Sequence, residues 1–201
     1  MLSFHTEDEL KRWKAANHVR VRLLRLNAIR YVYTRIFAPY GDSRLLDRYN
    51  ALRARLTRRG TDVREIVFIG MSLDDPSITP AEHCRYDLGV AFPTEAGGIV
   101  GGIIRSRGAS SRPGATLPDR AECEAEGVTM RDLAPQQVAG IHCVGDIAYE
   151  ERAWHYLYRL WLPSSGFVPA DLPAMELFVK LPEEIGWETF DLETCIPVAR
   201  C

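Results

Sequence analysis

The chain has 201 residues, of which 46% are hydrophobic and 26% charged, and its formal net charge is −2. A chain of this length buries more than half of its unfolded surface, so it needs neither a metal nor a disulfide for stability. No apolar run approaches the roughly 18 residues of a membrane-spanning helix, and acidic residues stand where a secretory signal would have its apolar core. These features exclude a membrane-spanning class and predict a cytoplasmic globular protein.

The first residues predict a short helix. Thr-Glu-Asp-Glu at positions 6–9 matches the capping box, in which the first and fourth residues satisfy each other's backbone donors, so we expect a helix through Asn17. This N-terminal extension, residues 1–18, is too short to hold a helix-turn-helix. If the protein is a transcription regulator, its DNA-binding part is expected to be absent from this chain.

The chain then repeats itself. LNAIRYVYTRIFAPYG at 26–41 resembles LAPQQVAGIHCVGDIA at 133–148, and YDLGVAFP at 86–93 resembles FDLETCIP at 190–197. The offset is 107 for the first pair and 104 for the second. A nearly constant offset predicts an internal duplication.

The first helical segment follows the turn near residue 41. Asp42 or Ser43 can cap its start, and Gly60 suits the left-handed position at its end. Its exposed face is rich in arginine. Its apolar stripe, at helical spacing, is formed by Leu45, Tyr49, Leu52 and Leu56.

A Gly-, Ser- and Pro-rich connection, residues 94–127, joins the predicted repeats 19–93 and 128–201. Its glycines lack the strand and helix that a dinucleotide fingerprint requires. We expect a mobile connection with a short strand from Ile99 to Arg105, inside one domain that covers residues 19–201.

The second helical segment corresponds to the first. Pro163 is expected to end it, with Gly166 beyond, and Glu150 and Glu151 are expected to begin its exposed face near the positive end of the helix dipole. Its apolar stripe is formed by Trp154, Leu157 and Trp161.

Two further strands complete each repeat, so the order is β-α-β-β, twice. Their sequences are VREIVFIGM and RYDLGVAFP in the first repeat, and AMELFVKL and TFDLETCIPV in the second. We predict an α+β fold built by tandem duplication of this unit, with antiparallel sheets, a pseudo-two-fold axis and a ligand crevice between the halves. Tyr86 and Phe190 are expected to anchor the twin strands, and Asp87 and Asp191 to make local turn hydrogen bonds.

The five cysteines form an odd set without a CxxC pair, which argues against a disulfide framework and a zinc site. His83 precedes Cys84 and His142 precedes Cys143, but neighbouring residues on a strand point to opposite faces, so neither pair converges on one atom. We expect no metal and no other cofactor.

Several segments carry a resemblance to a known family. They are RIFAPYG at 35–41, SLDDPSITPAEHCRYD at 72–87, AMELF at 174–178, DLETCIPV at 191–198, and Trp154 with Trp161. In these segments the chain resembles the gyrase-inhibitor-like (GyrI-like) effector-binding domain, found at the C-terminus of many AraC-family and some MerR-family regulators and as a stand-alone protein. Ala38 departs from the glycine that is usual in the first turn.

The resemblance implies that Glu176 lies in the ligand pocket. Independently, Glu176 interrupts an apolar strand, and Phe178 shares its face, so an acid and a ring line one patch. Such a patch suits an amphipathic or cationic small molecule. The alternative is a solvent-exposed sheet face, on which Glu176 merely alternates with Met175 and Leu177.

Other aromatic residues are candidates for the same pocket. Trp154, Tyr158 and Tyr33 can supply apolar and cation–π contact. Tyr40 either reaches the crevice or anchors its turn, and Trp161 is expected to be mostly packing.

Three functions compete. The leading one is a small-molecule sensor or sequestering protein. The second is a hydrolase, because some relatives act on reactive cyclopropane-containing compounds, with Glu176 as the candidate catalytic residue. The third is an interaction protein for DNA gyrase, or for nucleic acid through Arg44, Arg48, Arg55 and Arg59. Since the net charge is negative, we expect no direct nucleic-acid binding by this chain, and any DNA binding to come from a separate partner.

Overall fold

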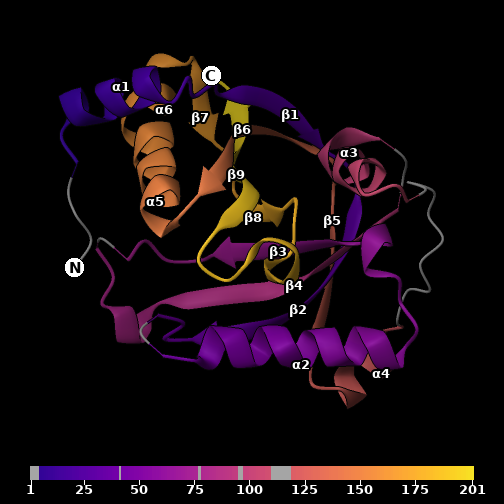
Figure 1. Ribbon diagram of the computed structural model, residues 1–201. Coiled ribbons are helices and arrows are strands. Elements are labelled where there is room, and N and C mark those ends of the chain that lie inside the picture. Colours follow the sequence, from indigo (N-terminus) through magenta and orange to yellow (C-terminus); the bar gives the residue numbers. More distant parts are fainter. Residues whose placement is uncertain (1–4, 41, 77, 95–96, 110–118) are drawn as a thin grey trace. The chain divides into compact units, whose positions relative to one another are not determined.

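The fold is known from a computed structural model, shown in Figure 1. It describes residues 5–40, 42–76, 78–94, 97–109 and 119–201. Gly41 of the RIFAPYG segment and Ser77 of the 72–87 segment lie outside these residues, as does part of the 94–127 connection. Within the described ranges, no helix is both long and apolar enough to cross a membrane.

The chain forms two compact units. The central unit comprises Arg25–Gln136, and the C-terminal unit comprises Gln137–Cys201 together with the N-terminal residues up to Leu24. One strand, β1 (Arg22–Leu26), runs across the boundary between them. Each unit is α+β and contains the predicted β-α-β-β order.

The central unit is built on an antiparallel sheet in the order β3-β4-β2-β5. Figure 1 shows α2 running along this sheet, and its Tyr49 ring lies 5.3 Å from that of Phe68 on β3. Tyr49, Leu52 and Leu56 are buried as predicted. The elements are β2 (Ile29–Phe37), α2 (Arg44–Arg58), β3 (Val67–Ser72), β4 (Arg85–Pro93), α3 (Gly98–Ser106), α4 (Arg120–Ala125), β5 (Thr129–Leu133), and the short 3-10 turns η1 (Val63–Glu65) and η2 (Ala81–His83).

The strand predicted from Ile99 to Arg105 is wrong, because these residues belong to helix α3. Val100, Ile103 and Ile104 are buried at helical spacing. A short apolar run fits a strand and a buried helix equally well by composition, and here the helical period decides.

The C-terminal unit has β9 between β6 and β8, with all pairs antiparallel and β7 added at the far end of β9. Helix α1 starts with the predicted capping box and packs on α5 through the Trp13 and Tyr149 rings, whose centroids are 5.1 Å apart. The elements are α1 (Glu7–Ala16), β6 (Gln136–Gly145), α5 (Ile147–Tyr156), the π-helical turn η3 (Leu157–Trp161), α6 (Leu162–Ser164), β7 (Phe167–Pro169), β8 (Ala174–Phe178), α7 (Pro182–Ile185) and β9 (Phe190–Arg200).

The core of this unit lies between α5 and the β6-β9 pair. Ile141, Ala153, Leu157 and Leu192 are almost fully buried there. Trp161 packs at its edge, stacked on Phe167 with centroids 5.9 Å apart, which agrees with its predicted packing role.

The aspartates of the twin strings make cross-strand contacts, so the predicted local turn bonds are wrong. The Arg35 guanidinium donates to both carboxylate oxygens of Asp87, at 2.7 and 2.8 Å. Asp191 lies 2.8 Å from His142 Nε2 and 3.4 Å from the Lys180 ammonium. A buried carboxylate needs a partner of this kind, and the partner is distant in sequence.

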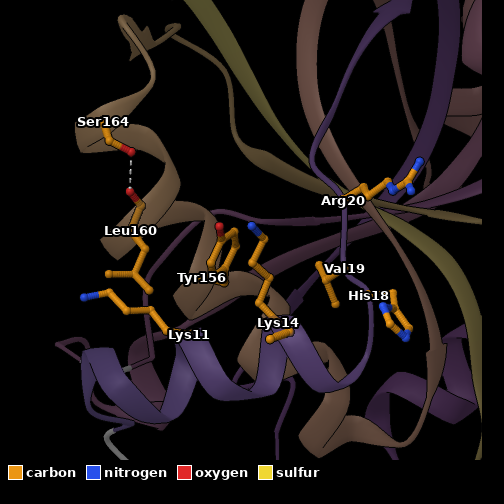
Figure 2. A pocket seen from close by; sticks show the side chains of 9 residues that line it. Lys11, Lys14, His18, Val19, Arg20, Tyr156, Leu160 and Ser164 are labelled. Atoms are coloured by element: carbon orange, nitrogen blue, oxygen red, sulfur yellow. Dashed lines mark hydrogen bonds between the residues drawn. The ribbon is translucent and has the colours of Figure 1, made fainter.

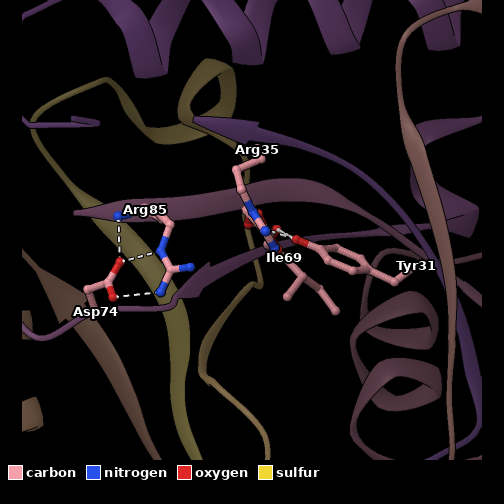
Figure 3. A network of polar contacts seen from close by, with 6 residues as sticks. Tyr31, Arg35, Ile69, Asp74 and Arg85 are labelled. Carbon is pink, nitrogen blue, oxygen red and sulfur yellow. Dashed lines mark hydrogen bonds and ion pairs between the residues drawn. The ribbon is translucent and has the colours of Figure 1, made fainter. Parts of the chain in front are cut away.

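Figure 3 shows the polar network of the central unit. Asp74 accepts three hydrogen bonds from Arg85, one from its backbone and two from its guanidinium. The Tyr31 hydroxyl donates to the Asp87 carbonyl at 2.7 Å and contacts the Ile69 carbonyl at 3.1 Å. The SLDDPSITPAEHCRYD segment therefore has a structural role, because it ties the start of β4 to the loop before it.

The unusual alanine of the first turn adopts a strained backbone conformation. Ala38 has φ of +48°, in the left-handed region that favours glycine. Its backbone N–H donates to the Cys84 carbonyl at 2.9 Å, which holds the turn in place. The departure from the usual glycine therefore leaves the turn formed at some conformational cost.

Candidate functional site

Helix α5 and the following turn η3 present Glu150, Trp154 and Tyr158 at intervals of four residues. Asp146 caps the helix, because its side chain accepts a hydrogen bond from the Tyr149 backbone N–H at 2.9 Å. The Trp154 indole N–H lies 3.3 Å from Glu150 Oε1, and the Trp154 and Tyr158 rings are stacked at 6.3 Å between centroids. The helix therefore joins an acid and two rings along one line.

Glu150 is buried, with 5% of its surface exposed, so its predicted exposure is wrong. It lies three residues before Ala153 and seven before Leu157, both fully buried, and therefore on the core-facing stripe. This spacing alone predicts that Glu150 is buried. Exposure was predicted instead because acidic residues in the first turn of a helix are favoured there by the helix dipole.

Strand β8 brings the second acid to the same place. Met175 and Leu177 are buried on one face, and Glu176 and Phe178 share the other, where both are half-buried. The prediction that Glu176 and Phe178 share a face is confirmed. Because that face is half-buried, the alternative of a fully exposed sheet face does not hold.

The carboxyl groups of Glu150 and Glu176 lie close enough to influence each other. Burial raises the pKa of Glu150 well above its usual range, and the neighbouring Glu176 carboxyl raises it further, whereas the Trp154 indole lowers it. Two like charges at one place are unfavourable, so this arrangement favours keeping a proton on Glu150. We call Glu150, Glu176, Trp154, Tyr158 and Phe178 the carboxylate cluster.

The hydrogen-bond pattern of the helix changes after Tyr156. Residues Leu157–Trp161 form a π-helical turn, in which the Leu162 N–H bonds to the Leu157 carbonyl. Pro163 has no N–H to continue the α-helical pattern, and Ser164 Oγ donates to the Leu160 and Trp161 carbonyls at 2.8 and 3.1 Å. Single π-helical turns of this kind often occur at functional sites.

The remaining predicted site residues, Tyr33 and Tyr40, belong to the central unit. Tyr33 is buried and stacks on Tyr31, with centroids 4.9 Å apart, above Gly89 of the neighbouring strand. Tyr40 is 40% exposed. The structure thus brings four of the six predicted residues together, and it adds Glu150 to them.

The arginine face of α2 is largely paired. Arg59 bonds to Glu122 at 2.8 Å, Arg55 to Glu126 at 3.0 Å and Arg44 to Asp42 at 2.7 Å. These carboxylates reduce the positive potential that a nucleic-acid interface would need.

The buried thiols are poor nucleophiles. Burial raises the pKa of Cys143 to about 12 and raises that of Cys195 well above the usual range. Among the described residues, no group of His, Cys, Asp and Glu is arranged to hold a metal ion.

Comparison with known proteins shows the family. The family model described as the GyrI-like small molecule binding domain matches residues 20–199. The chain belongs to this family. It is a small-molecule-binding domain, and the GyrI-like match covers all residues of the carboxylate cluster.

Relatives of known name include a candidate transcriptional regulator. YosT, a SPbeta prophage-derived protein of Bacillus subtilis (strain 168), is 29% identical over 92 residues, which are 42% of this chain and 61% of YosT. The chain therefore aligns with less than two thirds of that relative.

Solved structures confirm the fold. The C-terminal domain of EcmrR has a TM-score of 0.61 at 10% identity, with 91% of this chain and 99% of that chain covered. A hydrolase from Listeria innocua has a TM-score of 0.52 at 10% identity, with 93% and 98% covered. At such identities the likeness concerns the fold alone.

Proposed function

We propose that the carboxylate cluster binds a lipophilic organic cation and that the chain is an effector-sensing module or a stand-alone sequestering protein. The observation that carries this proposal is the proximity of buried Glu150 and half-buried Glu176 beside the Trp154 indole. An acid pair in which the pKa of one member is raised can exchange its proton for another cation.

The energetics favour a cation with apolar groups. An ionised carboxylate withdrawn from water is costly unless it is paired, and a bound cation removes this cost. The rings of Trp154, Tyr158 and Phe178 offer apolar contact and cation–π attraction of about 0.5 to 2 kcal/mol each. A small hydrated cation gains less, because it must lose its water without filling the aromatic surface.

The sensing role rests on population shift. A ligand that contacts α5 and β8 together favours the arrangement that holds both contacts, by no more than its differential affinity. The regulator description of YosT and the EcmrR fold support this use of the domain. A separate DNA-binding partner or segment would read the bound state.

Calorimetric titration with crystal violet, an aromatic cation, tests the proposal. We expect Glu176→Gln to weaken binding at least about tenfold, the equivalent of about 1.4 kcal/mol. Glu188→Gln is the matched control, because Glu188 is an exposed acid of the same unit. Equal affinity in all three proteins would reject the cationic site.

A hydrolase is the second candidate, since a protonated and an ionised carboxyl side by side can act as general acid and general base. The proximity of Glu150 and Glu176, with the raised pKa of Glu150, is the observation that favours it. Chromatography of a bound reactive compound after incubation would distinguish the two functions. Products that are lost in both Glu150→Gln and Glu176→Gln support the enzyme, and saturable binding without products supports the sensor.

A further inference from the structure

A hollow lies in the C-terminal unit, between α1 and the helical segment that runs from α5 into α6 (Figure 2). Its volume is about 720 Å³. One wall is lined by Lys11, Lys14 and Ala15 of α1 with His18, Val19 and Arg20 beyond it, and the other wall by Tyr156, Leu160 and Ser164.

This hollow is separate from the carboxylate cluster. Tyr156 follows Trp154 by two residues, and two residues on a helix turn the side chain by about 200°. The stripe Tyr156, Leu160 and Ser164 therefore faces away from the stripe of Glu150, Trp154 and Tyr158. Ligands of the two sites would contact opposite sides of the same helical segment.

The hollow is lined by bases. Of the nine described residues that line it, Lys11, Lys14 and Arg20 are cationic, His18 is titratable and none is acidic. Lys11 is paired with Glu7 at 3.3 Å. Within the described part of the chain, Lys14 and Arg20 form no ion pair. The described lining of the hollow thus includes two charged residues that no carboxylate neutralises.

The basic lining of the hollow contrasts with the acidic character of residues 137–201 in the same unit. Residues 137–201 carry more Asp and Glu than Lys and Arg. An anion is therefore repelled by most of this unit's surface and attracted to the segment around Lys14 and Arg20. Clefts lined by one sign of charge raise the local concentration of the opposite ion.

The opposite wall is apolar and aromatic. The Lys14 ammonium lies 5.8 Å from the centroid of the Tyr156 ring, and Figure 2 shows the two side chains next to each other. The Trp13 ring also contacts the Tyr156 ring, with centroids 6.5 Å apart. Leu160 extends the apolar wall. A ligand with a charged end and a flat or aliphatic body would match both walls.

We infer that this hollow is a second binding site, which takes a small organic anion with an apolar or aromatic body, such as an aryl sulfonate, phosphate or carboxylate. Lys14 and Arg20 hold the anionic group, and Tyr156 and Leu160 contact the body. The inference does not depend on the function proposed for the carboxylate cluster.

Fluorescence titration with anilinonaphthalene sulfonate tests the site. We expect Lys14→Gln and Arg20→Gln each to weaken binding about fivefold, because each removes one contact of an exposed charge. Arg12→Gln is the matched control, since Arg12 is an exposed base of α1 that does not line the hollow. Glu176→Gln should leave the titration unchanged, which separates this site from the carboxylate cluster.

Two outcomes would overturn the inference. One is equal binding by the wild-type, Lys14→Gln, Arg20→Gln and Arg12→Gln proteins, which would place the dye elsewhere. The other is binding to phosphatidylglycerol vesicles with no binding of the soluble dye or of naphthyl phosphate, which would make the hollow a lipid-surface contact. In the wild type, dye binding should weaken as the salt concentration rises. A smaller effect of salt in Lys14→Gln and Arg20→Gln supports the inference.

Discussion

The two repeats use equivalent positions differently. Val90 on β4 and Thr194 on β9 are 104 residues apart, the offset of the twin strings. Val90 faces Phe68 across the sheet, and Thr194 faces Glu176. The central unit therefore has a buried ring at the position where the C-terminal unit has a half-buried acid.

The contact between each sheet and its helix differs in the same way. Phe68 packs on Tyr49 of α2, whereas Glu176 lies near Glu150 of α5 and raises its pKa. An apolar helix–sheet contact stabilises the fold and leaves little for a ligand to gain. An acid pair at the equivalent contact costs stability and creates a place where a cation is favoured. The first repeat therefore serves mainly as a structural framework, and the second carries the candidate site.

The aspartates of the twin strings differ in the same way. Arg35 lies directly opposite Asp87, while His142 lies opposite Glu193 and reaches Asp191 diagonally. Arg35 is permanently charged, and its bond to Asp87 raises the pKa of the guanidinium further. The cation of the central pair is therefore permanent, whereas the other pair is ionic only when His142 is protonated.

The largest effect is expected at Gly89. A Cβ there would lie 2.3 Å from the Val32 carbonyl oxygen and 2.6 Å from Tyr33 Cβ, so Gly89→Ala should destabilise the protein by about 3 kcal/mol in urea denaturation. The equivalent residue of the other repeat is Glu193, which pairs with Arg22. Gly102→Ala is the control, because a Cβ there meets nothing within 4 Å, and it should stabilise the helix slightly. If Gly89→Ala lowers the free energy of unfolding only slightly, the close approach of Gly89 to Val32 and Tyr33 is contradicted.

Removing Arg35 should cost less. Arg35→Ala leaves Asp87 buried without its partner, and we expect a loss of about 2 kcal/mol, reduced from the buried-pair value because the arginine is partly exposed. His142→Ala should lose about 0.5 to 1 kcal/mol, since Lys180 still contacts Asp191. Urea denaturation of both variants at neutral pH checks the order, and the reverse order would refute the comparison.

The pH dependence of stability should depend on Glu150. Because the folded state raises the pKa of Glu150 above the ordinary 4.5, the folded protein keeps a proton that the unfolded chain has lost. This contribution is complete below the ordinary pKa and is lost as pH rises through the raised one, by up to about 1.4 kcal/mol per pH unit. Glu150→Gln should flatten the profile and Glu188→Gln should not. Identical profiles in all three proteins would argue against the shift.

The smallest effect is expected at the first turn. Ala38→Gly relieves a positive φ, and we expect a gain of about 0.5 kcal/mol after the greater freedom of glycine in the unfolded chain is subtracted. The equivalent residue of the other repeat, Gly145, is needed for a different reason, because a Cβ there would lie 3.0 Å from Tyr149 Cβ. Thermal denaturation measures the gain, and a loss would show that Ala38 is not strained.

Periodicity predicted much of the fold. The β-α-β-β order, the buried stripe of α2 and the shared face of Glu176 and Phe178 all follow from periods of two and 3.6 residues. These periods report which side of an element is buried and do not report what covers it. The partners of Asp87 and Asp191 were therefore missed, because each lies on another strand.

One of the two acids of the candidate site was predicted from the sequence, and the other was missed. Glu176 was found because it interrupts an apolar strand. Glu150 was missed because an acid in the first turn of a helix is usually exposed, and only its spacing from Leu157 indicated burial. A contact between two acids runs against simple charge rules, so local sequence patterns do not predict it.

The measurement that tests the account most directly is the number of protons released when crystal violet binds. It is obtained from calorimetric titrations in two buffers of different ionisation enthalpy. If the Glu150–Glu176 proton is exchanged for the cation, the wild type releases a measurable fraction of a proton per dye bound, and Glu150→Gln releases none. Equal proton release by both proteins, or dye binding that is unchanged in Glu176→Gln, would contradict the account.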